Sequence, residues 1–199
     1  MRKDTRTKLI DAGTRLFAQR GFAAVSIREL SQAANTNPAM ISYYFGGKEG
    51  LYAAVLEAQF QIVRDILEET SKLPLSPLDR IKAYAAAVLR VHRQQPCLMK
   101  FMHGEMLAPT PQLETVIKRH IAQIYEFVQR AIDEGIAAGQ FRPDIDPGFA
   151  AVALAGIMNF FFLARPVAAT MLPPGNTQDE QYVRQALKIY LNGVQNRAS

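Results

Sequence analysis

Residues 22–52 read FAAVSIRELSQAANTNPAMISYYFGGKEGLY, and this stretch decides the fold of the first part of the chain. Ser26 and Glu29 have the spacing of a capping box, which predicts that a helix begins after Ser26. We expect this helix to continue through Ala33. The polar residues 35–37 that follow it predict a tight turn.

A second short helix is expected directly after the turn, over residues 38–44. Its first residue is a proline that follows Asn37, and a helix accepts proline at its first position. Glycines at 46 and 47 end it. A longer helix over residues 4–19 precedes both. Two short helices joined by a polar turn behind a supporting helix are typical of a helix-turn-helix, whose second helix lies in the major groove of DNA.

The spacing of apolar residues separates an inner from an outer face of these helices. The residues expected to pack inward are Ile27, Leu30, Ala34, Ile41 and Phe45. The residues expected to face outward are Ala39, Met40, Ser42, Tyr43 and Tyr44. Periodicity alone also fits three helices that only pack against one another.

Positive charge is concentrated at the start of the chain. Residues 1–50 hold eight Lys and Arg against four Asp and Glu, whereas the whole chain has a net charge of only +5. A short basic arm is expected from Arg2, Lys3, Arg6 and Lys8. Such an excess suits phosphate contact on DNA, and a solubilising surface is the alternative.

Helical periodicity also dominates the rest of the chain. A long helix is expected over 48–71, and later helices are expected to begin near Ser76, after Pro96, at Thr110 and at Asp146. The last helix is expected after Thr177, which has capping-box spacing to Glu180. The predicted fold is therefore all-α with nine helices. We expect a DNA-binding domain over 1–47 and a helical regulatory and dimerisation domain over 48–199.

The segments Phe22–Leu30 and Ala39–Tyr52 resemble the signature of the TetR/AcrR family of transcriptional repressors. The nine predicted helices and the chain length of 199 residues are similar to that family as well. The run ISYYFGGKEGLY at 41–52 and the segment 104–111 further resemble the CecR-like subgroup. The resemblance implies a dimeric, ligand-responsive repressor that binds a palindromic operator.

The resemblance also implies which side chains contact DNA. They are Ser26, Arg28, Ala39, Met40, Ser42, Tyr43, Tyr44 and Lys48. Small or apolar side chains can meet a thymine methyl, and hydroxyls can bond bases or phosphates. Lys48 begins the fourth helix, where its charge adds to helix-end N–H groups aimed at a phosphate. Asn35 replaces the usual glycine of the turn, and Ser42 replaces a common tyrosine, so the base preference of relatives does not carry over.

The remaining helices are expected to hold a ligand pocket and a dimer interface. A small, largely apolar effector would meet Tyr84, Met99, Met102, His103, Met106, Tyr125, Met158, Asn159 and Phe162. Residues 149–163 are apolar nearly all round, so one face requires cover from a second subunit. The expected interface residues are Phe160, Phe161, Leu187 and Tyr190. Packing within one subunit is the alternative for both sets.

Catalysis finds little support in the sequence. The obvious candidates are Cys97, His92, His103 and His120, and none stands in a catalytic or metal-binding motif. We expect no cofactor and no metal; a helical adaptor that binds only protein remains a third hypothesis. A single cysteine and an N-terminus without a secretory signal predict a reducing, cytoplasmic setting. The longest apolar run, 148–164, is short for a membrane span.

Overall fold

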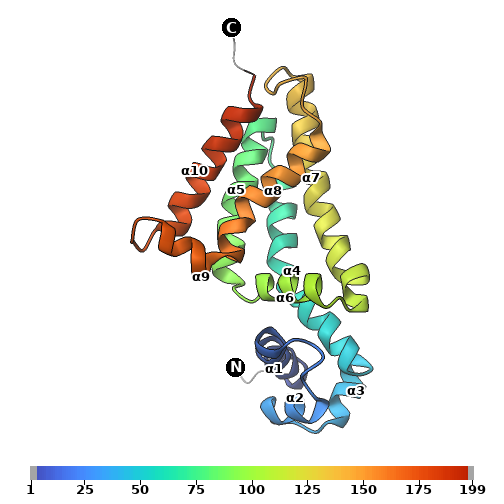
Figure 1. Ribbon diagram of the computed structural model, residues 1–199. Coiled ribbons are helices and arrows are strands. Elements are labelled where there is room, and N and C mark those ends of the chain that lie inside the picture. Colours follow the sequence, from blue (N-terminus) through green and yellow to red (C-terminus); the bar gives the residue numbers. More distant parts are fainter. Residues whose placement is uncertain (1–3, 197–199) are drawn as a thin grey trace. The chain divides into compact units, whose positions relative to one another are not determined.

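The computed structural model describes residues 4–196, and this range is helical with no extended strand (Figure 1). The helices are α1 (Thr5–Arg20), α2 (Ile27–Ala33), α3 (Ala39–Phe45), α4 (Lys48–Ser71), α5 (Pro77–Gln94), α6 (Leu98–Leu107), α7 (Lys118–Ala137), α8 (Pro147–Leu163), α9 (Arg165–Ala168) and α10 (Gln178–Val194). A π-helical turn, Leu113–Ile117, precedes α7, and a 3-10 turn, Ala169–Met171, follows α9.

The all-α prediction is confirmed, and the described residues contain one α-helix more than the nine expected. The extra helix is the short α9, which forms after α8 where the sequence analysis placed no helix. Pro166 lies in its first turn, and proline is tolerated there because the N–H groups of a first turn have no partner within the helix.

The chain divides into two compact units. The first comprises residues 1–62 and 95–120, and the second comprises 63–94 and 121–199. The first unit therefore contains α6 and most of α4 in addition to the three N-terminal helices. This division differs from the expected boundary after residue 47, which cuts the chain at the start of α4.

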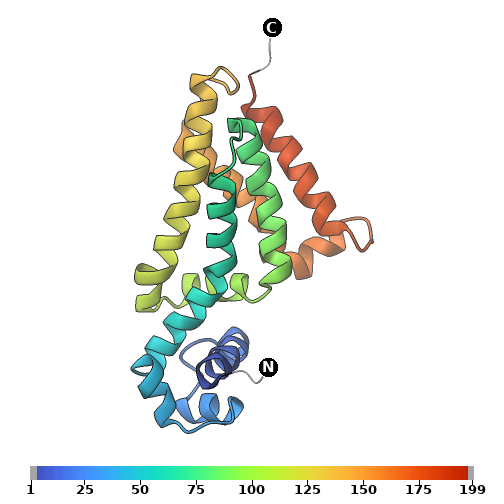
Figure 2. The same ribbon diagram turned by 180° about the vertical axis from the view of Figure 1, so that it is seen from behind.

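Local hydrogen bonds in the first unit begin its helices where the sequence indicates. The Asp4 carboxylate accepts from the Thr7 N–H at 2.7 Å and caps α1. The capping box of α2 is complete: the Ser26 hydroxyl accepts from the Glu29 N–H at 3.2 Å, and the Glu29 carboxylate accepts from the Ser26 N–H at 2.8 Å. In both views α1, α2 and α3 cluster together (Figure 1 and Figure 2).

The turn between α2 and α3 depends on a left-handed residue. Asn35 has a φ of 50°, and it is the one non-glycine residue with positive φ in the described range. The next residue, Thr36, donates its N–H to the Ser31 carbonyl at 2.9 Å, and the Asn37 side chain accepts from the Ala39 N–H at 2.8 Å. Asn35 thus takes the conformation that glycine would adopt most easily.

The predicted inner face is largely correct. Leu30, Ala34 and Ile41 are buried and Phe45 is half-buried. The prediction for Ile27 is wrong, since its side chain is 36% exposed. Ile27 is the first residue of α2, and a helical side chain covers the turn before its own Cα, which is lacking at this position.

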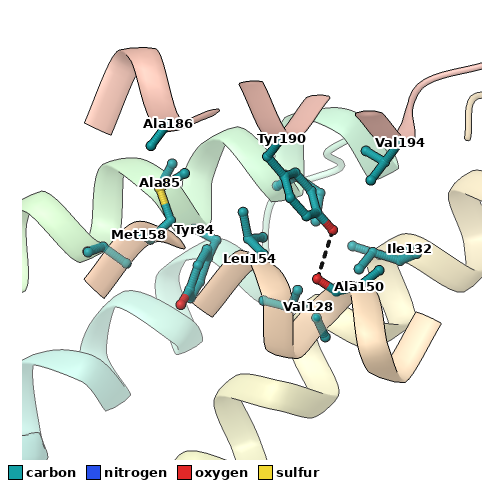
Figure 3. Close-up of a cluster of buried hydrophobic side chains, with 14 of the residues drawn as sticks. Tyr84, Ala85, Val128, Ile132, Ala150, Leu154, Met158, Ala186, Tyr190 and Val194 are labelled. Atoms are coloured by element: carbon teal, nitrogen blue, oxygen red, sulfur yellow. Dashed lines mark hydrogen bonds between the residues drawn. The ribbon is translucent and has the colours of Figure 1, made fainter. Parts of the chain in front are cut away.

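The core of the second unit lies among α5, α7, α8 and α10. Helices α8 and α10 each pack against α5 and against one another. Figure 3 shows Leu154 and Met158 of α8 beneath Ala186 and Tyr190 of α10. The Tyr190 hydroxyl donates to the Ala150 carbonyl at 3.0 Å, which satisfies a polar group inside this apolar core (Figure 3).

Two of the helix starts predicted for this unit differ in outcome. Asp146 caps α8 as expected, because its carboxylate accepts from the Phe149 N–H at 3.0 Å. The capping box predicted at the start of α10 is wrong: Thr177 makes no side-chain cap, and the Glu180 carboxylate accepts instead from Arg93 at 2.7 Å. A tertiary partner has replaced the local one.

Between residues 4 and 196, no single helix is both long and apolar enough to cross a membrane. Helix α8 and the following Arg165–Met171 segment pass that test only as a pair, and a bend of 70° separates them.

Candidate nucleic-acid interface

The outer face of α3 is polar and aromatic. Ala39, Ser42, Tyr43 and Tyr44 are exposed, as the sequence predicts, whereas Met40 is half-buried. Tyr43 is 76% exposed, and its ring meets that of Tyr44 edge to face with centroids 5.0 Å apart. Two neighbouring tyrosines held outward on one short helix present aromatic surface and hydroxyl groups to a partner.

The loop before α2 is clamped from both sides. Arg20 at the end of α1 donates to the Glu29 carboxylate at 2.6 Å and to the Ala24 carbonyl at 2.5 Å. Hydrogen bonds from Ser26, then from Arg20, lower the pKa of Glu29 to about 2. The carboxylate therefore stays charged at neutral pH, and it fixes the start of α2, from which Arg28 extends as an exposed side chain.

Lys48 is the first residue of α4, and an aromatic ring holds its side chain. The Lys48 ammonium lies 4.3 Å from the centroid of the Phe22 ring, which is within cation–π range. Phe22 in turn packs against the Tyr52 ring at 4.9 Å between centroids. Because Lys48 is the first residue of α4, its positive charge adds to that of the helix N-terminus, and this combination favours an anion.

The junction between α3 and α4 depends on a glycine that sequence reasoning did not single out. Gly46 ends α3 with a φ of 74°. In the first turn of α4, a Cβ atom built on Gly50 would lie 1.8 Å from the Phe45 carbonyl oxygen. Only glycine lets the two backbones approach this closely. The FGGKEG run at 45–50 is the sequence signal for it.

The predicted basic arm is only partly described. Arg2 and Lys3 lie outside the described residues. Arg6 and Lys8 belong to α1 and not to an extended arm, because the Asp4 cap begins the helix before them. The Arg6 guanidinium lies 5.5 Å from the Phe45 ring centroid, so it stands near the end of α3.

The predicted pocket residues fall into two groups. Met99, Met102, His103 and Met106 are all on α6 in the first unit, where the first two are half-buried and the others exposed. The second unit contains Tyr84, Tyr125, Met158, Asn159 and Phe162. Met158 is fully buried in the core, which makes it a packing residue in this structure.

Within the second unit, Asn159 is the centre of a polar cluster. It is 2.9 Å from His92 Nε2 through its Oδ1, and its amide donates to the Tyr84 hydroxyl at 3.5 Å. The Phe162 ring stacks on His92 with centroids 3.8 Å apart. Burial lowers the pKa of His92, so its ring is neutral at neutral pH. The predicted pocket set omitted His92, although it lies two helical turns after Tyr84 on α5.

A cavity of about 670 Å³ in the second unit is lined by other residues. It lies between the C-terminal half of α4, the loop after it, and α7, with Leu67, Arg80 and Phe127 among its walls. None of the predicted pocket residues lines it. In the described part of the chain, no group of three or more His, Cys, Asp or Glu side chains could hold a metal ion.

The predicted interface residues differ in how far they are exposed. Phe160 is 61% exposed, whereas Phe161 is fully buried and stacks on Tyr182 of its own chain. Tyr190 is buried as well, and Leu187 is half-buried. Phe161 and Tyr190 are therefore core residues. The large apolar side chains that α8 and α10 expose are Phe149, Val152, Phe160, Leu163 and Ile189.

Comparison with known proteins agrees with this arrangement. A family model described as "Bacterial regulatory proteins, tetR family" matches residues 9–55, which include α2 and α3. A second, described as "Tetracyclin repressor-like, C-terminal domain", matches residues 74–163. The chain is 26% identical over 147 residues to the repressor DhaR of Mycobacterium sp. (strain GP1), covering 73% of this chain and 74% of DhaR.

Two further relatives extend the likeness over almost the whole chain. The repressor KstR2 of Mycobacterium tuberculosis is 25% identical over 196 residues, covering 95% of this chain and 92% of its own. The solved structure of fatty acid degradation regulator FadR from Bacillus halodurans has a TM-score of 0.74 at 15% identity, covering 99% and 100% of the two chains. These matches do not distinguish the CecR-like subgroup, which stays a prediction.

Proposed function

The chain belongs to the tetR family of bacterial regulatory proteins and is a DNA-binding transcriptional regulator, not an enzyme; from this premise we propose that it is a dimeric repressor released from a palindromic operator by a small apolar effector. We propose the division into a DNA-binding domain over 1–47 and a regulatory domain over 48–199 as the functional one. Operator DNA as partner implies that the protein works in the cytoplasm.

The observation that carries the DNA-binding proposal is the exposed face of α3 beside the start of α4. Ser42, Tyr43 and Tyr44 are exposed, and the half-buried Lys48 is the first residue of α4. Hydroxyls reach bases or phosphates, whereas Lys48 supplies phosphate affinity. Ser26, Arg28, Ala39 and Met40 complete the proposed contact set at the starts of α2 and α3.

The exposed apolar stripe on α8 supports the proposed dimer. Phe149, Val152, Phe160 and Leu163 recur along one face of that helix, with Ile189 exposed on the adjoining α10. A stripe of this kind fits a self-complementary two-fold interface in which α8 and α10 meet their symmetry mates. Two-fold symmetry in the protein then calls for two inverted half-sites in the operator.

The proposed effector site combines half-buried aromatic and polar side chains. Tyr125, Asn159 and Phe162 are half-buried. The Asn159 amide donates to the Tyr84 hydroxyl, and a neutral His92 contacts both Asn159 and Phe162. Two of the similar proteins are named a ketosteroid transcriptional regulator and a fatty acid degradation regulator, and both names refer to largely apolar molecules. The other predicted pocket residues are on α6 of the first unit, and they stay a separate prediction.

Selection of genomic DNA fragments by the purified protein tests the proposal directly. We expect enrichment of one sequence with inverted half-sites, bound by an even number of protein chains as measured by sedimentation. Repression is tested by a reporter that carries the selected site between promoter and gene. Recovery of no specific sequence would reject the operator proposal and favour an adaptor that binds protein.

Effector binding is tested by linkage. An effector that releases DNA must bind the DNA-free state more tightly, so operator DNA must weaken its binding by the same factor. Titration of each candidate with and without operator measures both affinities. Equal affinities would exclude that candidate as an inducer.

A further inference from the structure

Helix α6 buries a carboxylate in an otherwise apolar face. Its buried residues are Leu98, Phe101 and Glu105, at the spacing of one helix face, and Glu105 is only 2% exposed. Burial of a carboxylate is unfavourable unless hydrogen bonds replace its lost hydration. Glu105 accepts three: from the Tyr52 hydroxyl at 2.8 Å, the Thr110 N–H at 2.9 Å and the Thr110 hydroxyl at 2.9 Å.

The bond to Tyr52 connects α6 to α4 inside the first unit. Burial, and after it the hydrogen bond to Glu105, raises the pKa of Tyr52 well above its usual value, so the hydroxyl keeps its proton and donates. A hydrogen bond is directional, whereas a leucine at position 105 would only fill space. Glu105 therefore fixes the orientation of the Tyr52 ring as well as its depth.

Tyr52 is the centre of an aromatic cluster. Its ring lies 5.0 Å from Phe17 of α1 and 6.0 Å from Phe101 of α6, measured between centroids. The third neighbour is Phe22, in the loop between α1 and α2, at 4.9 Å. Phe22 is half-buried, so one ring face remains for another group.

That group is the Lys48 ammonium. It lies 4.3 Å from the Phe22 centroid, and Lys48 precedes Tyr52 by one turn of α4. Phe22 thus contacts both side chains. The sequence of contacts runs from Glu105 through Tyr52 and Phe22 to Lys48, and every member belongs to the first unit.

We propose that Glu105 is a positioning residue for DNA binding: by orienting Tyr52 it holds Phe22 in the place where Phe22 seats the Lys48 ammonium. This rests on the proposed phosphate contact of Lys48. Without the Tyr52 bond the aromatic ring is free to tilt, and the ammonium loses its preset position. Glu105 itself touches no DNA.

Two readouts test the proposal, one with DNA and one without. In the first, operator affinity is measured for Tyr52→Phe in the wild-type and Lys48→Ala backgrounds. Tyr52→Phe keeps the ring and removes the hydroxyl that reaches Glu105. Tyr190→Phe is the matched control, since it removes another buried, hydrogen-bonded tyrosine hydroxyl in the second unit. Glu105→Gln tests the other end of the same bond, with thermal melting to confirm folding.

The second readout is the NMR shift of the Lys48 ε-methylene protons in the free protein. The Phe22 ring shields protons above its face, so these protons should resonate upfield in the wild type. Tyr52→Phe and Glu105→Gln should move them toward the shift of an unstructured lysine. Tyr190→Phe should leave them in place.

In the wild-type background, where Lys48 is present, we expect Tyr52→Phe to weaken operator binding about threefold or more. A coupling of this size is typical of side chains in contact. The same substitution should have little effect when Lys48 is already alanine. The positioning role would be overturned if the effects of Tyr52→Phe and Lys48→Ala on operator affinity were fully additive and the Lys48 ε-methylene resonance did not move. If Lys48→Ala alone leaves operator binding unchanged, the phosphate contact is wrong, and the NMR shift then decides the positioning role separately.

Discussion

Arg93 of α5 holds the first turn of α10 through Asp179. Its Nε donates to Asp179 Oδ2 at 2.9 Å and its Nη2 to Oδ1 at 3.2 Å, while Nη2 also donates to Glu180 at 2.7 Å. These residues are 86 and 87 positions apart from Arg93 in the chain. A partner so distant in sequence explains why the local capping box predicted for α10 does not form.

Replacement of Arg93 by alanine should lower the Tm of the protein modestly, since the bond is charge-assisted but half-exposed on the arginine side. The hydrogen bond from Arg93 is the main cause that lowers the pKa of Asp179. A lowered folded-state pKa stabilises the protein above the unfolded pKa of about 4, and this stabilisation is lost as pH falls through the folded value.

Melting curves of wild type and Arg93→Ala between pH 7 and pH 3 check this. The difference in Tm should be constant near neutral pH and should shrink at the acid end. Arg90→Ala is the control, because Arg90 on the same helix has only an exposed pair with Glu69 at 3.5 Å. An Arg93 effect no larger than that of Arg90 would contradict the assignment.

Lys48→Ala should reduce both operator affinity and its dependence on salt. Each lost phosphate contact lowers the slope of log affinity against log salt by about 0.9. Lys72→Ala provides the control, because Lys72 follows the far end of the same helix and pairs with Glu68. Titrations at several salt concentrations measure the slope; an unchanged slope for Lys48→Ala would show that its ammonium contacts no phosphate.

Local signals made the N-terminal helices predictable. The capping box of α2 joins residues three positions apart, and the left-handed turn needs only Asn35 to adopt a positive φ. The bond between Tyr52 and Glu105 was not predicted, because it joins residues 53 positions apart. Its only trace in the sequence is a glutamate on the same helical face as Leu98 and Phe101.

The two faces of α8 could not be distinguished in advance for a different reason. The helix is apolar on all sides, so periodicity gives no direction, and Phe160 and Phe161 appeared equivalent. In the structure the Phe160 side chain is exposed and the Phe161 side chain is fully buried. Only the packing of α5 and α10 decides which phenylalanine fills the core.

Because Phe160 is exposed and Phe161 is buried, substitutions at the two positions test dimerisation and folding separately. Phe160→Asp places a charge on the exposed stripe, where it should produce monomers by sedimentation while leaving Tm nearly unchanged, since burial of an unpaired carboxylate opposes association. Phe161→Ala should instead lower the free energy of unfolding by about 3–5 kcal/mol, as is typical of a phenylalanine removed from a core. A Phe160→Asp protein that remains dimeric would place the interface elsewhere.

Glu29 should titrate far below an ordinary glutamate. Its pKa of about 2, against a usual value of 4.5, arises from Ser26 first and Arg20 second. The carboxylate therefore stabilises the loop before α2 fully at pH values above the pKa of Glu29 in the unfolded chain. This stabilisation is lost as pH falls toward about 2. An NMR titration of the Glu29 side chain checks the midpoint, and Arg20→Ala should raise it. A midpoint near 4.5 in the wild type would contradict the clamp.

Gly50→Ala should disrupt the junction of α3 and α4. Its new Cβ would lie 1.8 Å from the Phe45 carbonyl oxygen, which is backbone and cannot rotate away, so α3 must shift relative to the start of α4. Because α3 carries the proposed base contacts, we expect operator affinity to fall by more than tenfold, the factor that about 1.4 kcal/mol produces. Gel shift with the selected operator measures this.

Gly104→Ala is the matched control for the same change of residue. Gly104 lies inside α6, and a Cβ there would meet no atom within 4 Å. Alanine favours a helix over glycine by up to about 1 kcal/mol, so Gly104→Ala should raise Tm and leave operator binding intact. Helix propensity alone would make both glycine-to-alanine substitutions stabilising. A disrupted junction in Gly50→Ala beside a raised Tm in Gly104→Ala therefore tests the close approach at Gly50. Equal gains in Tm with unchanged operator affinity for both variants would show that the junction tolerates a side chain.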